Sequence, residues 1–244
     1  MITGSLARPD GGLCFDSLGS GPDVLLLHAG GERRRVWHPV MVYLARYGCR
    51  ATAYDQRGHG ESTGGRAFTL PAYGEDAIDM VARLTMPVVV GASLGGFAAL
   101  LALADAATEA NVAGLVLVDV FPDPDPERTL RFLAPLGMDK SPLVADILGR
   151  RDRLREITRG LSLPILAVRA DERAGITDSD AARFLELAPH AQIASVAGAG
   201  HLIAKEKPVE LAALLSEFQL SNAVRERRRN RAMRNSQGRN FSPK

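Results

Sequence analysis

Short apolar runs alternate along the chain with longer stretches in which apolar residues recur at helical spacing. The apolar runs predict six strands, at residues 24–27, 50–54, 87–90, 115–118, 165–168 and 192–196. The stretches between them predict helices at about residues 36–46, 71–84, 94–107, 178–187 and 208–218. Apolar strands separated by amphipathic helices are typical of a parallel sheet covered by helices. The pattern therefore predicts an α/β fold with a mostly parallel central sheet.

Residues at the expected helix ends support these boundaries. Pro71 and Pro208 fit the first turn of a helix, where the missing N–H costs no hydrogen bond. Asp178 and Ser179 are residue types that cap helix N-termini.

The stretch from Phe121 to Gly160 breaks the alternation. It opens with Phe-Pro-Asp-Pro-Asp-Pro and continues with interrupted helical patterns rich in Arg, Leu and Pro. A connection of this length usually has a structure or function of its own. We predict a small helical lid inserted between two strands at about residues 122–160. The alternative is an ordinary crossover that contains two helices.

Length and charge suggest one folded domain followed by a tail. The 244 residues are 46% hydrophobic, which suffices for one domain with a substantial core, expected at residues 1–224. Residues 225–244 hold seven Arg, one Lys and one Glu, so this tail has a formal charge of +7. Since the whole chain has a net charge of +2, the remaining residues carry 2 − 7 = −5. An acidic body with a short basic tail is not typical of a nucleic-acid-binding domain. The polar, aperiodic tail is expected to be disordered.

Cysteine usage and hydropathy predict the compartment. Cys14 and Cys49 are too few for a disulfide framework, and no Cys/His cluster has zinc spacing. The N-terminus does not resemble a signal peptide, and no apolar run approaches the roughly 20 residues that span a bilayer. We expect a soluble cytoplasmic monomer or homodimer that binds a small-molecule substrate, with no nucleic-acid or membrane partner and no metal or cofactor.

The strongest chemical motif is Gly91-Ala92-Ser93-Leu94-Gly95, which lies between a predicted strand and a predicted helix. A nucleophile elbow has this arrangement, because its serine sits on a strained strand-to-helix turn that needs small neighbours. The helix N-terminus beneath the serine favours developing negative charge. The motif alone could be a glycine-rich turn with a capping serine, but the strand before it and the helix after it favour a nucleophile at Ser93.

A second motif, His28-Ala29-Gly30-Gly31, follows the strand at residues 24–27. In the fold that the elbow suggests, this loop supplies one backbone N–H of an oxyanion hole, and the residue after the nucleophile supplies the other. These donors are expected at Gly30 and Leu94. His28 itself is predicted to be a buried structural histidine. By themselves, the two glycines could form a simple turn.

A third motif, Ala197-Gly-Ala-Gly-His201, follows the strand at residues 192–196. A histidine on a loop of small residues at a strand end can approach a nucleophile. Serine preceding histidine along the chain also fits the order of this fold. We predict that His201 is the general base, and the alternative is a surface histidine.

Together with Asp55-Gln-Arg-Gly-His-Gly-Glu-Ser62, these motifs resemble the α/β-hydrolase superfamily. The similarity is closest to its small esterases, carbon–carbon hydrolases and haloperoxidase-like members, and it covers about residues 10–220. The resemblance implies Ser–His chemistry without a cofactor. A serine at position 93 argues against haloalkane dehalogenase and epoxide hydrolase chemistry, since those relatives carry aspartate there. The 55–62 motif marks a loop after the fourth strand of that fold, and by itself it indicates a turn with an Asp–Arg pair.

The acid of the triad departs from the family pattern. In most relatives, the strand that resembles Pro164–Arg169 is followed by a glycine and then by the triad aspartate, shortly before an Ile/Val-Ser/Thr pair. Alignment on Ile176-Thr177 places residues 173–174 at the position of that aspartate. Asp171 and Glu172 come two or three residues too early.

A second acid position exists in the superfamily, at the end of the preceding strand. Asp119 occupies it, and a carboxylate at the carboxyl edge of a parallel strand faces the crevice where ligands bind. A loop-capping role is the alternative for this residue. We rank Asp119 first, Asp171 second and Glu172 third. A Ser–His dyad without an acid is the fourth possibility, because the acid orients the histidine but is not the nucleophile.

The function predicted from these residues is hydrolysis of an ester, thioester or lactone of a small organic molecule by Ser93 and His201. The lid is expected to set substrate choice, with Trp37, Phe121 and Phe132 as candidate pocket aromatics or simple core residues. One alternative is a carbon–carbon hydrolase, or a biosynthetic enzyme for elimination, cyclisation or acyl transfer. The other is a non-catalytic ligand-binding protein, which a missing acid would favour.

Overall fold

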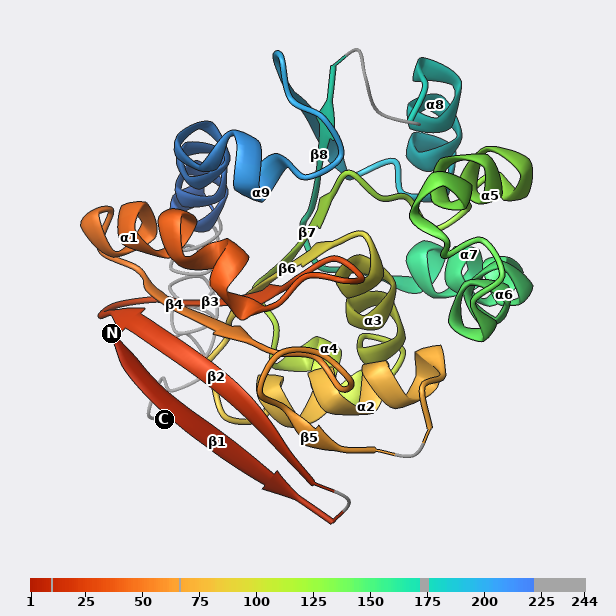
Figure 1. Cartoon of the computed structure of the whole chain (residues 1–244). Helices are drawn as coiled ribbons and strands as arrows, with labels where there is room; N and C mark the ends of the chain where they lie inside the picture. The colour runs from red at the N-terminus through yellow and green to blue at the C-terminus, as the bar shows by residue number, and fades with distance from the viewer. Residues whose placement is uncertain (10, 66, 172–175, 222–244) are drawn as a thin grey trace, which may run out of the picture.

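A twisted, mostly parallel sheet with helices on both faces forms the centre of the molecule (Figure 1). The computed structural model describes residues 1–9, 11–65, 67–171 and 176–221. The strands are β1 (Ile2–Arg8), β2 (Gly11–Gly19), β3 (Asp23–Leu27), β4 (Arg50–Tyr54), β5 (Thr63–Gly64), β6 (Val88–Ala92), β7 (Gly114–Val118), β8 (Ile165–Ala170) and β9 (Gln192–Val196). The basic tail predicted at residues 225–244 lies outside the described residues.

Helices are found at each of the five predicted stretches, and further helices lie between them. They are η1 (Arg34–Trp37), α1 (His38–Arg46), α2 (Leu70–Val81), α3 (Leu94–Ala102), α4 (Ala106–Ala110), α5 (Pro126–Leu133), η2 (Ala134–Leu136), α6 (Pro142–Gly149), α7 (Arg151–Gly160), α8 (Asp178–Leu187) and α9 (Ile203–Glu206), with residues 208–221 also helical. Across the described ranges, none of these helices is long and apolar enough to cross a membrane.

The strand order is β1-β2-β4-β3-β6-β7-β8-β9, and β5 pairs with β2. Strand β2 is antiparallel to its neighbours β1, β4 and β5, whereas the pairs from β4 through β9 are parallel. The sequence-based prediction of a mostly parallel sheet is therefore confirmed.

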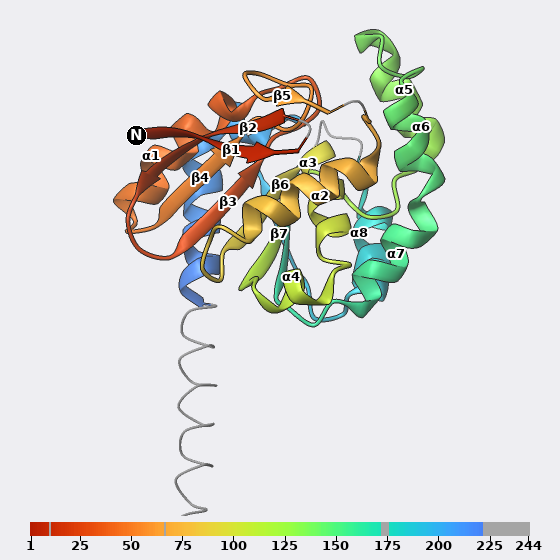
Figure 2. The same cartoon turned by 90° about the horizontal axis from the view of Figure 1, so that it is seen from below.

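The central parallel strands β3, β6 and β7 bury both of their faces, which explains why they are continuous apolar runs. In β3, Leu25 and Leu27 face the core beneath α2 and α3, whereas Val24 and Leu26 face the core beneath α1 and residues 208–221. Figure 2 shows the two helical layers on either side of the sheet. Burial on both faces fixes the register of the strands, because a slip of one residue exchanges the two faces.

The antiparallel hairpin of β1 and β2 was not predicted. It pairs residues in register from Ile2 opposite Ser17 to Arg8 opposite Gly11. Strand β1 has no fully buried residue, since it forms the edge of the sheet, so it lacks the apolar run that marks the central strands.

Two helix ends differ from the prediction for local reasons. Helix α3 ends at Ala102, and α4 starts after Asp105, whose side chain accepts a hydrogen bond from Thr108 N–H as an N-cap. Helix α8 is capped by Thr177, not by Asp178 or Ser179, and Thr177 forms a reciprocal capping box with Asp180.

The stretch between β7 and β8 is helical throughout most of its length, and it contains α5, η2, α6 and α7. We call residues 122–160 the insertion. Helix α7 buries Leu154 and Ile157 in the core, but α5 buries no residue. Arg128 of α5 instead forms an ion pair of 2.6 Å with Asp180 of α8. In Figure 1, α5 and α6 lie with α7 and α8 at one side of the sheet.

The sheet changes winding direction at β3, because β4 lies on one side of it and β6 on the other. The loops that follow β3 and β6 diverge at this point, and such switch points are where open α/β sheets bind ligands. The loop after β3 begins at His28, and Ser93 follows β6 directly.

Candidate active site

Ser93 occupies a strained turn between β6 and α3. Its φ of 47° and ψ of −113° place it in a region that residues with a side chain rarely adopt. A Cβ atom at Gly95 would overlap the carbonyl oxygen of Leu27, and one at Gly91 would overlap the carbonyl oxygen of Gly95. The two glycines of the motif therefore let the turn pack directly on β3, as a nucleophile elbow requires.

Asp119 and His201 are hydrogen-bonded to each other. His201 Nδ1 lies 2.8 Å from Asp119 Oδ2, and the carboxylate is buried. The other carboxylate oxygen accepts a hydrogen bond of 3.1 Å from Ala170 N–H at the end of β8. Asp119 also has a positive φ of 48°, which turns its side chain at the end of β7. Because Nδ1 donates to the carboxylate, the lone pair of a neutral His201 ring lies on Nε2.

Ser93 lies next to the strand that carries this acid. Its N–H donates to Val118 O over 3.3 Å, and Asp119 is the following residue. Among the described residues, neither the Ser93 hydroxyl nor His201 Nε2 has a hydrogen-bond partner. The structure thus joins the predicted base and acid directly and places the predicted nucleophile on the neighbouring strand.

Two further carboxylates hold the loop that carries His201. Asp171 Oδ1 accepts a hydrogen bond of 3.0 Å from Gly198 N–H, and Glu206 Oε2 accepts one of 2.7 Å from Gly200 N–H. Asp171, ranked second as the acid, therefore bonds to the backbone of the loop and not to the imidazole. Glu172, ranked third, lies outside the described residues.

The two predicted oxyanion donors are neighbours. A Cβ atom at Gly30 would lie 3.8 Å from Leu94 Cδ2 and 3.9 Å from Leu94 Cβ. Leu94 is the first residue of α3, so its N–H is one of the donors that a helix cannot satisfy internally. Within the described part of the chain, the N–H groups of Gly30 and Leu94 have no acceptor. Both are available to a negatively charged oxygen beside Ser93.

His28 fixes the direction of the Gly30 N–H. Its Nδ1 donates to Ala29 O over 2.8 Å, and Glu32 N–H donates to the same oxygen over 3.1 Å. In a planar trans peptide the C=O and N–H point in opposite directions, so the Gly30 N–H points away from both donors. His28 is fully buried, and its Nε2 accepts a hydrogen bond of 3.0 Å from Gln56 N–H. The prediction of a buried structural histidine is confirmed.

Burial lowers the pKa of His28 to about 4, from 6.5 in an unfolded chain. Between these values the unfolded chain takes up a proton that the folded chain does not, so stability falls as the pH falls from 6.5 to 4. The full difference corresponds to about 3 kcal/mol. We expect His28→Gln to remove this contribution, so that denaturant unfolding at pH 7, 5 and 4 shows a smaller loss of stability than in the parent. Equal losses in both proteins would contradict the assignment.

Two side chains of the insertion lie against this site. The Phe132 ring makes an edge contact with the His201 ring at a centroid distance of 4.9 Å, and Phe132 is 43% exposed. The terminal methyl of Met138 lies 3.6 Å from the position of a Cβ at Gly30. Of the other predicted pocket aromatics, Trp37 is fully buried in the core, and Phe121 stacks on Phe184 at 4.7 Å. Those two positions are core residues.

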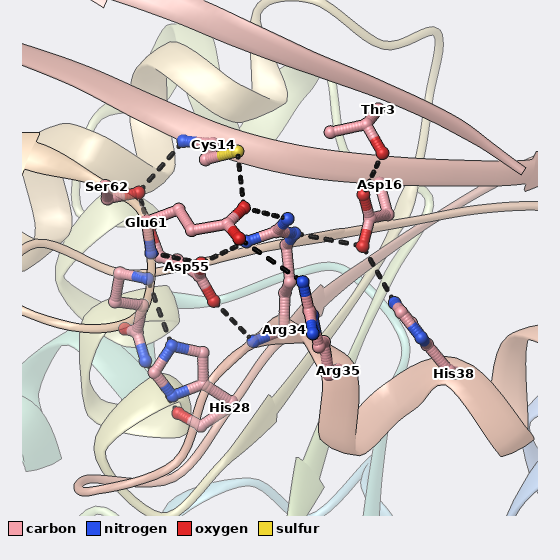
Figure 3. Close-up of polar contacts among 11 residues, drawn as sticks. Thr3, Cys14, Asp16, His28, Arg34, Arg35, His38, Asp55, Glu61 and Ser62 are labelled. Carbon is pink, nitrogen blue, oxygen red and sulfur yellow. Dashed lines mark hydrogen bonds and ion pairs between the residues drawn. The ribbon is translucent and has the colours of Figure 1, made fainter.

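The acid and the arginine of the 55–62 motif pair with residues outside the motif. Asp55 pairs with Arg34 from the loop after β3, and Arg57 pairs with Asp76 of α2. Figure 3 shows Arg34 held among Asp55, Asp16 and Glu61. Asp55 and Arg57 have different partners, so the motif, which also contains a turn closed by His59 N–H and Gln56 O, connects the loop after β3 with α2.

Residues 24–174 match a family model described as the alpha/beta hydrolase family. The chain belongs to this family. An esterase of Mycobacterium tuberculosis, Rv0045c, is 36% identical to this α/β hydrolase over 139 residues, which are 55% of this chain and 43% of that protein. The chain therefore aligns with less than half the length of that curated relative.

Solved structures share the fold of this α/β hydrolase at low identity. A thioesterase domain from the curacin biosynthetic pathway superposes with a TM-score of 0.71 and 20% identity, covering 88% of this chain and 98% of that one. E-2-(acetamidomethylene)succinate hydrolase superposes with a TM-score of 0.74 and 20% identity, covering 89% of this chain and 98% of that one. An esterase from Thermogutta terrifontis superposes with a TM-score of 0.73 and 22% identity, covering 91% of this chain and 99% of that one. These superpositions confirm the predicted α/β-hydrolase fold.

Three residues at the site of this α/β hydrolase escaped the sequence analysis. Glu206 lies five positions after His201 in an ordinary helical pattern, and Met138 lies in the insertion, so no local motif marks either one. His59 was part of a recognised motif, but its contact with Gly31 joins residues 28 positions apart. Such contacts depend on the placement of loops from different strands.

Proposed function

We propose that this α/β hydrolase is a serine hydrolase that cleaves a carboxylic ester, thioester or lactone of a small organic molecule. The observation that carries the proposal is the 2.8 Å hydrogen bond between His201 Nδ1 and the buried Asp119, beside the strained Ser93 turn. A histidine held in this tautomer by a carboxylate is the arrangement that activates a serine.

The reaction proceeds in two stages. His201 Nε2 accepts the Ser93 proton while Ser93 Oγ attacks the acyl carbon, and the carbonyl oxygen becomes an oxyanion bound by the Gly30 and Leu94 amides. His201 then gives the proton to the ester oxygen or thioester sulfur as its bond to the acyl carbon breaks, so that an alcohol or thiol leaves and the acyl group stays on Ser93. Water, activated by the same histidine, adds to the acyl carbon and releases the acid. Asp119 stays ionised and stabilises the imidazolium in both stages.

The acid position supports this function over a non-catalytic one. The ligand-binding alternative depended on a missing acid, and Asp119 supplies a carboxylate in direct contact with His201. The names of the similar proteins, an esterase, a thioesterase domain and a hydrolase, are consistent with ester and thioester chemistry.

The insertion acts as the lid in this proposal. Phe132 covers the edge of the His201 ring, and Met138 approaches Gly30, so the walls nearest the reacting carbon are apolar. Esters with apolar groups on either side of the carbonyl are therefore the favoured substrates. The Arg128–Asp180 ion pair holds α5, which carries Phe132, against α8.

The proposal is tested by treating the protein with a fluorophosphonate probe and short-chain p-nitrophenyl esters. We expect ester turnover and a covalent adduct that mass spectrometry maps to Ser93. The Ser93→Ala variant should show neither. Ser179→Ala is the matched control, because Ser179 is an exposed serine of α8, and it should label and turn over as the parent does. An intact, folded parent that gives no Ser93 adduct and no turnover would falsify the proposal.

A further inference from the structure

The 55–62 motif is a second point of contact for the loop that carries the oxyanion donor. We call residues 28–34 the oxyanion loop and residues 55–62 the clamp loop. The clamp loop contacts the oxyanion loop at its start, middle and end, through Gln56 to His28, His59 to Gly31 and Asp55 to Arg34. Figure 3 shows the contact between Asp55 and Arg34. The middle contact involves the residue directly after Gly30.

The His59 ring is a hydrogen-bond acceptor toward Gly31. His59 Nδ1 lies 2.9 Å from Arg57 O, and since a carbonyl oxygen only accepts, Nδ1 carries the hydrogen. The lone pair on Nε2 then accepts the Gly31 N–H over 3.1 Å. The ring is held by edge contacts with His28 at 5.0 Å and Tyr73 at 6.4 Å between centroids.

Besides His59, the middle of the oxyanion loop is restrained by one backbone hydrogen bond, from Glu32 N–H to Ala29 O over 3.1 Å, which closes a turn around Gly30 and Gly31. Gly30 and Gly31 are consecutive glycines, and glycine backbones adopt many conformations at low cost. Gly31 has a positive φ of 78°, it is exposed, and no atom lies within 4 Å of its Cβ position. Packing therefore does not hold this residue. The peptide before Gly30 is fixed at Ala29 O, and the peptide after Gly30 is fixed by the Gly31 N–H bond to His59.

We propose that His59 is a positioning residue for the oxyanion hole. By accepting the Gly31 N–H, it fixes the peptide plane that follows Gly30 and keeps the Gly30 N–H directed at the oxygen that becomes negative. The inference rests on the serine-hydrolase function proposed above. It gives the histidine of the 55–62 motif a role in the reaction, although His59 does not contact the reacting atoms.

Two substitutions separate this role from a structural one. His59→Gln keeps a neutral acceptor at nearly the reach of Nε2, and His59→Leu removes the acceptor. We expect His59→Leu to lower kcat on a p-nitrophenyl ester by about 10- to 100-fold with KM changed less than threefold, because direct loss of an oxyanion donor costs about 10²- to 10³-fold. Binding of a trifluoromethyl ketone, which forms an oxyanion adduct with Ser93, should weaken by the same factor. His59→Gln should stay within about threefold of the parent in both measurements.

Hydrogen exchange of the peptide that contains Gly31 reports on the hydrogen bond between Gly31 N–H and His59 without an activity assay. Exchange at Gly31 should quicken in His59→Leu and not in His59→Gln, with thermal unfolding used to confirm that both variants are folded. Unchanged exchange in His59→Leu would show that His59 does not restrain the Gly31 N–H, which contradicts the proposal. Faster exchange with unchanged kcat overturns the role in the oxyanion hole. A folded parent without turnover would contradict the serine-hydrolase function and, with it, the role of His59 in the oxyanion hole. The exchange result would still show whether His59 restrains the Gly31 N–H.

Discussion

Replacing Ser93 with alanine should lower kcat for ester hydrolysis by about 10⁶-fold, and replacing His201 with alanine should cost about as much. The two groups act as one unit, because the serine is a weak nucleophile until the histidine takes its proton. The double variant should therefore lose no more than the worse single variant. Steady-state kinetics on one p-nitrophenyl ester measure all three proteins.

Stability provides the control for this result. Ser93 and His201 are both partly exposed, so neither side chain is a large part of the core. Thermal unfolding of the variants should stay close to that of the parent. Additive losses in the double variant would mean that Ser93 and His201 act separately, which contradicts the proposed mechanism.

Asp119→Asn should lower kcat by about 10⁴-fold with KM nearly unchanged. The asparagine can keep the Ala170 N–H bond through its carbonyl oxygen and then presents an N–H to His201. That donor favours the wrong tautomer of the ring, with the hydrogen on Nε2, where the Ser93 proton has to be accepted. The loss therefore follows from protonation and not from a change of shape.

Asp171→Asn and Glu206→Gln are the matched controls for the acid. Each of these carboxylates bonds to a backbone N–H of the loop that carries His201, and the amide that replaces it retains an acceptor oxygen. We expect kcat losses of about tenfold or less. A greater loss in Asp171→Asn than in Asp119→Asn would transfer the role of the acid to Asp171.

The central sheet and the two catalytic candidates could be predicted because their determinants are local. A strand such as β3 is apolar on both faces, and Gly91, Ser93 and Gly95 share one turn whose geometry excludes larger residues. The same is true of His201, which stands on a loop of small residues after β9. Each of these motifs can be recognised from residues within about five positions, although the atom that excludes a Cβ at Gly95 belongs to Leu27 of β3.

The acid could only be ranked, because the choice depends on how strands pair. Asp119 meets His201 across 82 positions of sequence, after β7, β8 and β9 have aligned side by side. Asp171 lies near the same loop and bonds to Gly198, so both residues fit a general expectation of a carboxylate at this edge. The positive φ of Asp119, which orients its side chain, has no signature in the sequence.

The edge hairpin and the clamp loop were missed for related reasons. Strand β1 pairs on one side only and buries no residue fully, so hydrophobicity does not mark it. The 55–62 motif suggested an internal ion pair, since Asp55 and Arg57 are close in sequence. Their actual partners, Arg34 and Asp76, lie 21 and 19 positions away.

Apart from Arg128, which pairs with Asp180, helix α5 can change its sequence with little effect on the core, because it contributes no buried side chain. Its apolar residues Leu130 and Phe132 are exposed, so they do not have to fit a packed core as the buried residues of α3 and α7 do. Because Phe132 contacts His201, under the proposed function we expect substitutions at Phe132 to change substrate choice while the Asp119–His201 pair and the sheet stay intact. Under that proposal, the exposed apolar positions of α5 are a suitable choice for mutant libraries that aim at new substrates.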